Sequence, residues 1–265
     1  MKYFIISDIH SYYSILKRTL EEKGFSLSKD HVVVLLGDAF DRGKETRETA
    51  EFLLALHDQG KLIYILGNHE ELLVKCLHQL ARGEDPIDIA NSYHAINGTW
   101  QSLLDLANMS ESEAVAHPQT LVANVLSSRV YKELFASCVD YYETDKYVFT
   151  HGFIPCFEKG FSPYVTYSYN EDWRDASPEE WYRARWYNGV KIAMESKIHV
   201  PNKTVVCGHW HVSAFHSKYE SKGSEWGVDA DFTPYFSEDG AVIGIDACTA
   251  TSQTINCLVF DSEDL

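Results

Sequence analysis

Five short blocks rich in Asp, His and Gly stand out in this sequence, and each directly follows an apolar run of strand length. The runs lie at residues 3–7, 32–36, 62–66, 147–150 and 204–207. The blocks that follow them lie at residues 8–10, 37–43, 67–70, 151–152 and 208–211. Short apolar runs bounded by turn residues are typical of buried strands. Because ligands collect at the carboxyl ends of strands in open α/β sheets, we expect the five blocks to converge.

The first third of the chain alternates between predicted strands and predicted helices. Helices are expected at about residues 14–22, 45–57 and 70–80, each after one of the first three strands. This βαβαβα pattern predicts parallel strands joined by right-handed crossovers. The carboxyl part returns to strands, which predicts a second, more antiparallel sheet at residues 203–207, 241–246 and 253–260.

Residues 81–142 break this alternation. Helix-like stretches occur at 98–107 and 120–138, with almost no strand signal, so the sequence predicts a helical insertion or cap within a single domain of residues 1–265. A stretch rich in Tyr, Pro and Ser at 153–169 predicts a long loop, and 178–194 predicts a helix. Long loops often border a functional site.

Composition limits the class of protein and of partner. With 265 residues, of which 45% are hydrophobic, the chain can bury a sizeable core. Its apolar runs are too short for a membrane span and no signal peptide precedes the first strand, so we expect a cytoplasmic protein without a membrane partner. The formal charge of -16 argues against a nucleic acid duplex as partner. A phosphorylated peptide or small phosphate stays compatible, because bound cations would reverse the local field.

The residue types in the five blocks suit a pair of metal ions. Carboxylate oxygens and imidazole nitrogens are ligands for manganese, iron and zinc. Asp8 and His10 are separated by one residue at a strand end, so both side chains can turn toward one ion. A second Asp from the neighbouring strand can bridge to the other ion. Our hypothesis is that Asp38 is this bridge.

Taken in order, the blocks resemble the pattern of the calcineurin-like metallophosphoesterases, D-x-H, G-D-x-x-[DR], G-N-H-[ED], H and G-H-x-H. The resemblance implies a four-layer α/β/β/α sandwich of two mixed sheets. It implies that one metal is held by Asp8, His10, Asp38 and His211. It implies that the other metal is held by Asp38, Asn68, His151 and His209. For the two divalent or trivalent ions manganese is the first choice, with iron or zinc as alternatives.

Block 37–43 resembles more specifically the G-D-x-x-D-R-G of a bacterial branch related to the phosphoprotein phosphatases. By that resemblance Asp41 orients His69, the general acid, and Arg42 clamps the substrate phosphate. The resemblance also implies that a metal-activated hydroxide attacks phosphorus, without a covalent enzyme intermediate. A second clamping arginine is expected, with Arg185 preferred over Arg183. The expected substrate-binding residues are therefore Arg42, Asn68, Arg183 and Arg185.

The leading functional hypothesis is a metal-dependent phosphomonoesterase of the Ser/Thr protein phosphatase type. One alternative is a bis(5′-nucleosyl)-tetraphosphatase, in which aromatic side chains from residues 153–187 would stack on a nucleobase. A phosphodiesterase acting on a small nucleotide is another. A non-catalytic metal-binding scaffold is the remaining alternative, disfavoured because the ligand set and the acid are complete. The physiological substrate and the oligomeric state stay open.

Overall fold

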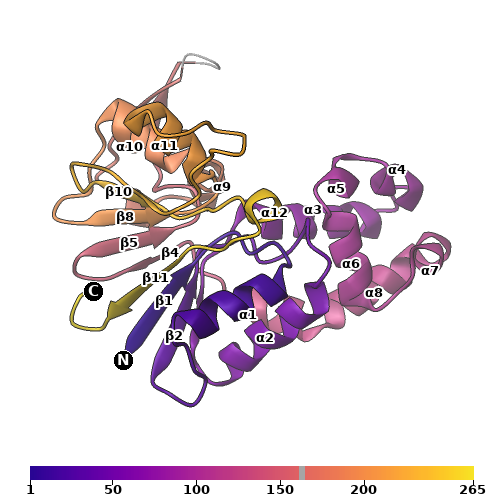
Figure 1. The fold of residues 1–265 in the computed structure, drawn as a ribbon. Helices are drawn as coiled ribbons and strands as arrows, with labels where there is room; N and C mark the ends of the chain where they lie inside the picture. The colour runs from indigo at the N-terminus through magenta and orange to yellow at the C-terminus, as the bar shows by residue number, and fades with distance from the viewer. Residues whose placement is uncertain (161–164) are drawn as a thin grey trace.

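The computed structural model describes residues 1–160 and 165–265 and stacks two mixed β-sheets between layers of helices (Figure 1). The first sheet has the strand order β11-β1-β2-β3. Its first three strands in the chain pair in parallel, and the last strand runs antiparallel to β1. The bounds of these strands are β1 Lys2–Ile6, β2 His31–Leu35, β3 Leu62–Tyr64 and β11 Cys257–Asp261.

The second sheet has the order β4-β5-β8-β10-β9. Its three central strands are parallel, and an antiparallel strand lies at each edge. The bounds are β4 Tyr141–Glu143, β5 Tyr147–Thr150, β8 Thr204–Cys207, β9 Tyr235–Phe236 and β10 Val242–Gly244. The predicted pair of mixed sheets is confirmed, and the second sheet is the more antiparallel of the two, with two antiparallel pairings against one in the first.

Alternation of side chains along the strands builds three apolar layers. In β1, Phe4 and Ile6 point to one core, while Ile5 points to the core between the two sheets. In β8, Val205 faces the outer helices and Val206 faces the core between the sheets. Because every central strand is covered on both faces, its sequence is continuously apolar, which is why the sequence reveals the strands so clearly.

Helices cover the outer face of each sheet. The first sheet carries α1 Tyr13–Glu22, α2 Thr46–Asp58 and α3 Asn68–Ala81. The second sheet carries α9 Pro178–Arg185, α10 Gly189–Ser196 and α11 Val212–Glu220, and a short helix, α12 Thr249–Ser252, precedes β11. Among the described residues, no helix combines the length and apolarity needed to cross a bilayer.

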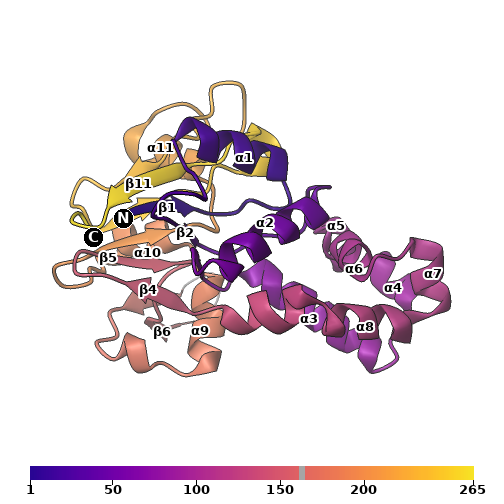
Figure 2. The same ribbon diagram turned by 90° about the horizontal axis from the view of Figure 1, so that it is seen from below.

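Residues 86–137, which we call the helical region, lie at the end of the molecule opposite the two termini (Figure 2). The region packs on α3 and α2. It consists of α4 Pro86–Ala90, α5 Tyr93–Ile96, α6 Thr99–Ala107, α7 Glu111–Ala116, α8 Pro118–Ser127, the π-helix η1 Val130–Leu134 and the 3₁₀-helix η2 Phe135–Ser137.

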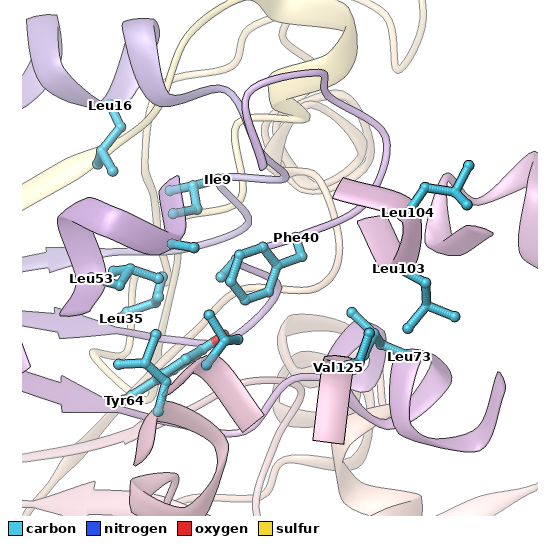
Figure 3. Close-up of a cluster of buried hydrophobic side chains, with 14 of the residues drawn as sticks. Ile9, Leu16, Leu35, Phe40, Leu53, Tyr64, Leu73, Leu103, Leu104 and Val125 are labelled. Atoms are coloured by element: carbon cyan, nitrogen blue, oxygen red, sulfur yellow. The ribbon is translucent and has the colours of Figure 1, made fainter. Parts of the chain in front are cut away.

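One side chain joins this region to the sheet. Phe40, from the loop after β2, lies between the residues that pack on the first sheet and those that pack on the helical region (Figure 3). It is 1% exposed, and its ring centroid lies 6.0 Å from that of Phe135. The loop that carries Asp38 and Asp41 is therefore anchored in the core by the residue between them.

Four local expectations from the sequence are corrected. Strand β4 begins at Tyr141, so the last two residues of the predicted helical stretch 81–142 belong to a strand. The predicted loop contains a hairpin of β6 Phe157–Lys159 and β7 Thr166–Ser168, and its residues 161–164 lie outside the described residues. The predicted helix 178–194 is interrupted, because the Asn188 side chain accepts a hydrogen bond from Lys191 N–H and starts α10. The last strand joins the first sheet, since an apolar pattern does not specify a strand's neighbour.

Candidate metal centre

The structure brings the five blocks together at the carboxyl edge of both sheets. Backbone hydrogen bonds connect them, such as the one from His10 N–H to the Asp38 carbonyl at 3.0 Å. Carboxylates accept others: Asp38 Oδ1 from His69 N–H and Asp8 Oδ2 from His209 N–H, both at 3.0 Å. Side chains that lie up to 201 residues apart in the chain thus share one site.

Two clusters of ligand atoms share Asp38. One joins Asp38 to His10 and His69, and the other joins it to His151 and His209, with the atoms of each cluster within 4.8 Å of one another. The carboxylate faces both ways, because His10 Nε2 lies 3.7 Å from Oδ2 and His151 Nε2 lies 3.4 Å from Oδ1. Such a carboxylate is placed to bridge two cations.

Backbone carbonyls fix which ring nitrogen faces Asp38. The Phe40 carbonyl lies 3.0 Å from His10 Nδ1, and the Leu36 carbonyl lies 2.7 Å from His151 Nδ1. A carbonyl oxygen only accepts, so Nδ1 is the donor in each neutral ring and Nε2 keeps its lone pair. A ligating histidine is oriented in this way when its second nitrogen binds a metal.

Burial favours the neutral form of the histidine rings at this edge. Desolvation is the main cause that lowers the pKa of His151, and it lowers the pKa of His10 and His209 well below the ordinary value. The Trp186 carbonyl accepts a hydrogen bond from the His209 ring. Neutral imidazole is the form that coordinates metals, so the protonation state of all three rings fits that role.

Three buried carboxyl groups at this edge have raised pKa values, because burial destabilises their ionised forms. Burial raises the pKa of Asp38, raises that of Asp8 to about 6, and raises that of Asp246 to about 8. Asp8 and Asp246 also repel each other electrostatically. Divalent cations would offset this charge, and the nitrogen and oxygen donors present suit manganese, iron or zinc. The residues therefore fit a pair of metal ions.

Asn68 lies at the start of α3 with its amide oxygen 2.8 Å from His151 Nε2. Because that nitrogen carries a lone pair, the amide oxygen and the ring nitrogen are two acceptors that face each other. The same nitrogen faces Asp38. This convergence of acceptors on one point is a further sign of a cation site.

The backbone of the blocks adopts a conformation that side chains other than Gly rarely take. Left-handed φ angles between 46° and 75° occur at Asp8, His10, Ser11, Asp38, Asp41, Arg42 and His209. Gly67 makes the packing of the edge possible, since a Cβ there would clash with the Asp38 side chain. Strain of this kind persists where the surroundings fix the backbone, and it concentrates at functional sites.

Glu70 is a support that the sequence did not assign a role. Its carboxylate is fully buried and accepts hydrogen bonds from Asp38 N–H at 3.0 Å and Ala39 N–H at 2.9 Å. It also accepts from Gly67 N–H at 2.9 Å and from the Tyr64 hydroxyl at 2.8 Å. One carboxylate thus joins the ends of β2 and β3. Its place as the last residue of block 67–70 was the available signal.

Asp246 is a second residue to which the sequence assigned no role, although residues 244–247 resemble the phosphoprotein phosphatase branch. It follows β10 as Asp8 follows β1, and its carboxylate accepts a hydrogen bond from Cys248 N–H at 2.7 Å. The sequence analysis placed it at the end of a strand and gave it no chemistry. The strand-end argument that identified the five blocks would also have identified this one.

His69 forms a short chain of contacts with two residues of block 37–43. Its Nδ1 lies 2.8 Å from Asp41 Oδ2, and its Nε2 lies 3.2 Å from Arg42 Nη2. Burial lowers the pKa of His69, but Asp38 and the hydrogen bond to Asp41 raise it more, so it lies above its ordinary value. Because a guanidinium only donates, Nε2 accepts from Arg42 here and Nδ1–H donates to Asp41, so Nε2 can take up a proton only when Arg42 turns to another acceptor.

Helix α6 and the turn before it support this chain directly. The Thr99 hydroxyl donates to Asp41 Oδ2 at 2.7 Å, and the Ser102 hydroxyl accepts from Asp41 N–H at 3.0 Å. The Asn97 carbonyl accepts from Arg42 N–H at 3.1 Å. The sequence analysis left the role of residues 81–142 open, and these contacts give the region a positioning role at the site.

The two later arginines lie in different surroundings. Arg185 is 6% exposed and forms ion pairs with Glu71 and, at 2.5 Å, with Asp140. Its guanidinium is committed to these carboxylates, which is at odds with the expected phosphate clamp. Arg183 is exposed and lies 3.7 Å from Glu158 and 3.6 Å from Glu179.

Two expected metal ligands lie beside the clusters and not within them. Asp8 binds Ser7 and the backbone of His209 through its carboxylate. His211 Nε2 lies 3.0 Å from Glu225 Oε1, and its ring centroid lies 4.2 Å from that of Trp226. Their roles as ligands remain part of the proposal below.

Sequence comparisons match the chain to known phosphoesterases. The asymmetrical bis(5′-nucleosyl)-tetraphosphatase PrpE of Bacillus velezensis is 32% identical over 84 residues, 29% of this chain and 34% of that protein. The symmetrical enzyme of Vibrio campbellii is 34% identical over 85 residues, 32% of this chain and 31% of that one. Serine/threonine-protein phosphatase 2 of Salmonella typhimurium is 38% identical over 69 residues, 26% of this chain and 29% of that one. The chain thus spans about a third of the length of these relatives.

Solved structures share the fold over nearly the whole chain. The cold-active protein-tyrosine phosphatase of a psychrophilic Shewanella has a TM-score of 0.52 at 16% identity, covering 98% of this chain and 75% of that one. A protein serine/threonine phosphatase from Saccharomyces cerevisiae has a TM-score of 0.51 at 12% identity, covering 99% and 80%. The family model for calcineurin-like phosphoesterases matches residues 1–213. The chain therefore belongs to the calcineurin-like phosphoesterase family, whose members are metal-dependent hydrolases.

Proposed function

We propose that this enzyme removes phosphate from a phosphomonoester, in the manner of a Ser/Thr protein phosphatase. The observation that carries the proposal is Arg42, an exposed guanidinium that contacts His69 and has no carboxylate within ion-pair distance in residues 1–160 and 165–265. A free planar guanidinium beside a buried general acid suits a terminal phosphate, because it can bind two phosphate oxygens at once.

Two metal ions would be held by the expected ligands, which are Asp8, His10, Asp38, Asn68, His151, His209 and His211. When bound, such ions polarise a phosphoryl group and lower the pKa of a bound water to near neutrality. The protein supplies the remaining parts. Asp38 is placed between both histidine clusters, and Glu70 holds the backbone that carries it.

His69 is proposed to donate a proton to the leaving oxygen. Asp41 accepts its Nδ1–H, and the raised pKa favours the protonated ring at neutral pH. Nε2 faces the space between Arg42 and Asp38, where the substrate phosphate would lie, and it would carry the proton once Arg42 donates to that phosphate and no longer to Nε2. Arg42 would neutralise charge on the transferred phosphoryl group, which is worth most in the transition state.

The direct test is phosphate release by manganese-loaded protein from a phosphothreonine peptide and from p-nitrophenyl phosphate. We expect release by the wild-type protein and none above background by Asp38→Asn. Asp88→Asn, which changes an exposed Asp on α4 in the same way, serves as the matched control and is expected to keep full activity. Absence of release from every monoester would contradict the proposal.

A second candidate is a bis(5′-nucleosyl)-tetraphosphatase, favoured by the asymmetrical and symmetrical tetraphosphatases among the relatives. Aromatic rings lie beside the site, because Trp186 and Trp210 have ring centroids 6.0 and 6.1 Å from that of His209. Both also line a cavity of about 390 Å³ together with Tyr187. Indole rings so placed suit a nucleobase as well as a peptide side chain.

Diadenosine tetraphosphate separates the two candidates. Release of ADP, or of AMP and ATP, faster than any monoester is cleaved would favour the tetraphosphatase. In that case Trp210→Ala should raise KM for the dinucleotide and leave KM for p-nitrophenyl phosphate unchanged. If only the monoesters are cleaved, the monoesterase proposal stands.

A further inference from the structure

A groove of about 600 Å³ runs along α3, away from the metal centre. It begins beside the first turn of the helix, which also carries Asn68 and His69, and continues to Arg82 just beyond the last turn. The opposite wall is formed by η1 and η2 of the helical region, and Tyr182 of α9 lies at one end. We call this feature the α3 groove. None of the metal or phosphate residues proposed above lines it.

The α3 wall of the groove carries exposed basic side chains beyond the first turn of the helix, while Glu70 and Glu71 at the first turn are bound to the backbone after β2 and to Arg185. Lys75, His78 and Arg82 lie three and four residues apart on α3, so they share one side of the helix. All three are exposed, and within the described residues no carboxylate lies within ion-pair distance of any of them. In a chain with a formal charge of -16, the unpaired cations Lys75 and Arg82 are a local reversal of sign. It favours a negatively charged occupant.

The facing wall is apolar and aromatic. Tyr131 and Phe135 are half-buried, and their ring centroids lie 6.3 Å apart. They are presented by a π-helical turn that passes directly into a 3₁₀ turn, an irregularity that is frequent at functional sites. Val74 of α3 also lines the groove. The occupant must therefore offer apolar side chains on the side opposite its charges.

The length of the groove selects the kind of occupant. From Glu71 to Arg82 the helix rises about 16 Å, at about 1.5 Å per residue. Five residues of extended peptide span about the same length, at about 3.3 Å per residue. Successive side chains of an extended peptide point to opposite sides, so alternating acidic and apolar residues would face the two unlike walls.

We propose that the α3 groove binds an extended acidic segment of a protein partner. Its carboxylates contact Lys75, His78 and Arg82, and its apolar side chains pack on Tyr131 and Phe135. The segment needs no phosphate, so this binding is separate from catalysis and goes beyond the proposed function. Because the groove starts at the helix that carries His69, a substrate protein held there has its neighbouring residues close to the metal centre.

The test is fluorescence anisotropy with labelled seven-residue peptides in which Glu or Asp alternates with Leu or Phe, without phosphate, and the full chain. A matched peptide set has Lys in place of every acidic residue. We expect saturable binding of acidic peptides, weaker binding of the lysine set, and loss of affinity with added salt. The double variant Lys75→Glu/Arg82→Glu should weaken binding by at least about tenfold, since attraction becomes repulsion at two positions.

Two further variants make the outcome decisive. Lys17→Glu reverses an exposed charge on α1, outside the groove, and should leave binding unchanged. Asp38→Asn should also bind the peptides normally, so that failure of the catalytic proposal and failure of this one are distinguishable. The proposal is overturned if no acidic peptide binds saturably, or if Lys17→Glu weakens binding as much as the double variant. It is also overturned if the double variant loses binding of ADP but still binds the acidic peptides.

Discussion

The metal-ligand blocks and the helical region are stabilised in opposite ways. The blocks contain buried carboxylates, neutral histidines and left-handed backbone at residues with bulky side chains. In the helical region the one non-glycine residue with a left-handed φ is Asn108, which ends α6 in the manner usual for Asn. The comparison teaches that left-handed backbone at non-glycine residues gathers in the metal-ligand blocks and is nearly absent from the helical region.

The helical region is held by apolar packing against α3. Leu103 of α6 and Leu121 of α8 are fully buried, as are Leu73 and Leu77 on α3. Nothing in this packing needs a metal. Substitutions in the metal-ligand blocks should therefore change activity, and substitutions in the helical region should change stability.

Replacing His69 by Ala should give the largest effect, and on rate alone. Loss of the general acid lowers kcat by about 10²–10⁴. Because the pKa of His69 is raised, its protonated form dominates below that pKa and the wild-type rate should fall as the pH rises through it. The measurement is a pH profile of kcat beside a thermal melt. An unchanged alkaline limb in His69→Ala would assign the acid to another group.

Arg185 offers a test at the border between the two parts. Arg185→Met leaves Glu71 and Asp140 without their cation, and breaking a buried ion pair costs about 3–5 kcal/mol of unfolding free energy. We expect KM for p-nitrophenyl phosphate to stay unchanged in the folded fraction. A large rise in KM with normal stability would instead restore Arg185 as a phosphate clamp. Arg183→Met, at an exposed position, is the matched control for stability.

Leu103→Ala should affect stability and spare the chemistry. Truncating a fully buried leucine leaves a cavity and costs about 2–5 kcal/mol. Denaturant unfolding measures this loss, and kcat per folded molecule should remain that of the wild type. Leu103→Met, which keeps the volume, should cost less than about 1.5 kcal/mol. A fall in kcat at full folding would mean that α6 transmits more to the site than its packing indicates.

The contrast between the metal-ligand blocks and the helical region also explains which features could be predicted from the sequence. Asp38 and His151 were identified because their residue types carry the chemistry and each follows a continuously apolar strand. The four-layer fold followed from the same strands together with the family resemblance. Helices in the 81–142 stretch could be expected only coarsely, because their short amphipathic segments contain no residue whose type fixes a position.

The rest depended on partners that lie far away in the chain. The sequence does not distinguish an Arg185 that clamps phosphate from one that forms a buried ion pair. Its partners Glu71 and Asp140 lie 114 and 45 residues away in the chain. The hairpin of β6 and β7 was missed because its strands are largely exposed and show no apolar alternation. The pattern of apolar residues predicts a helix or strand when one face of that element is buried, and it carries little information otherwise.

Thr99 should give the smallest effect and the sharpest test of the division between the two parts. It lies at the start of α6 and is fully buried, and its hydroxyl donates to the Asp41 carboxylate that orients His69. Thr99→Val keeps the shape of the side chain and removes that hydrogen bond. A supporting hydrogen bond of this kind is worth about tenfold in activity, so kcat should fall by about that factor while KM and the affinity for manganese stay constant. Thr120→Val, at an exposed position of α8, controls for the loss of a hydroxyl in the same region. If kcat is unchanged in Thr99→Val, Asp41 is held well enough by the Ser102 contact and its own strained backbone, and the helical region serves the site through packing alone.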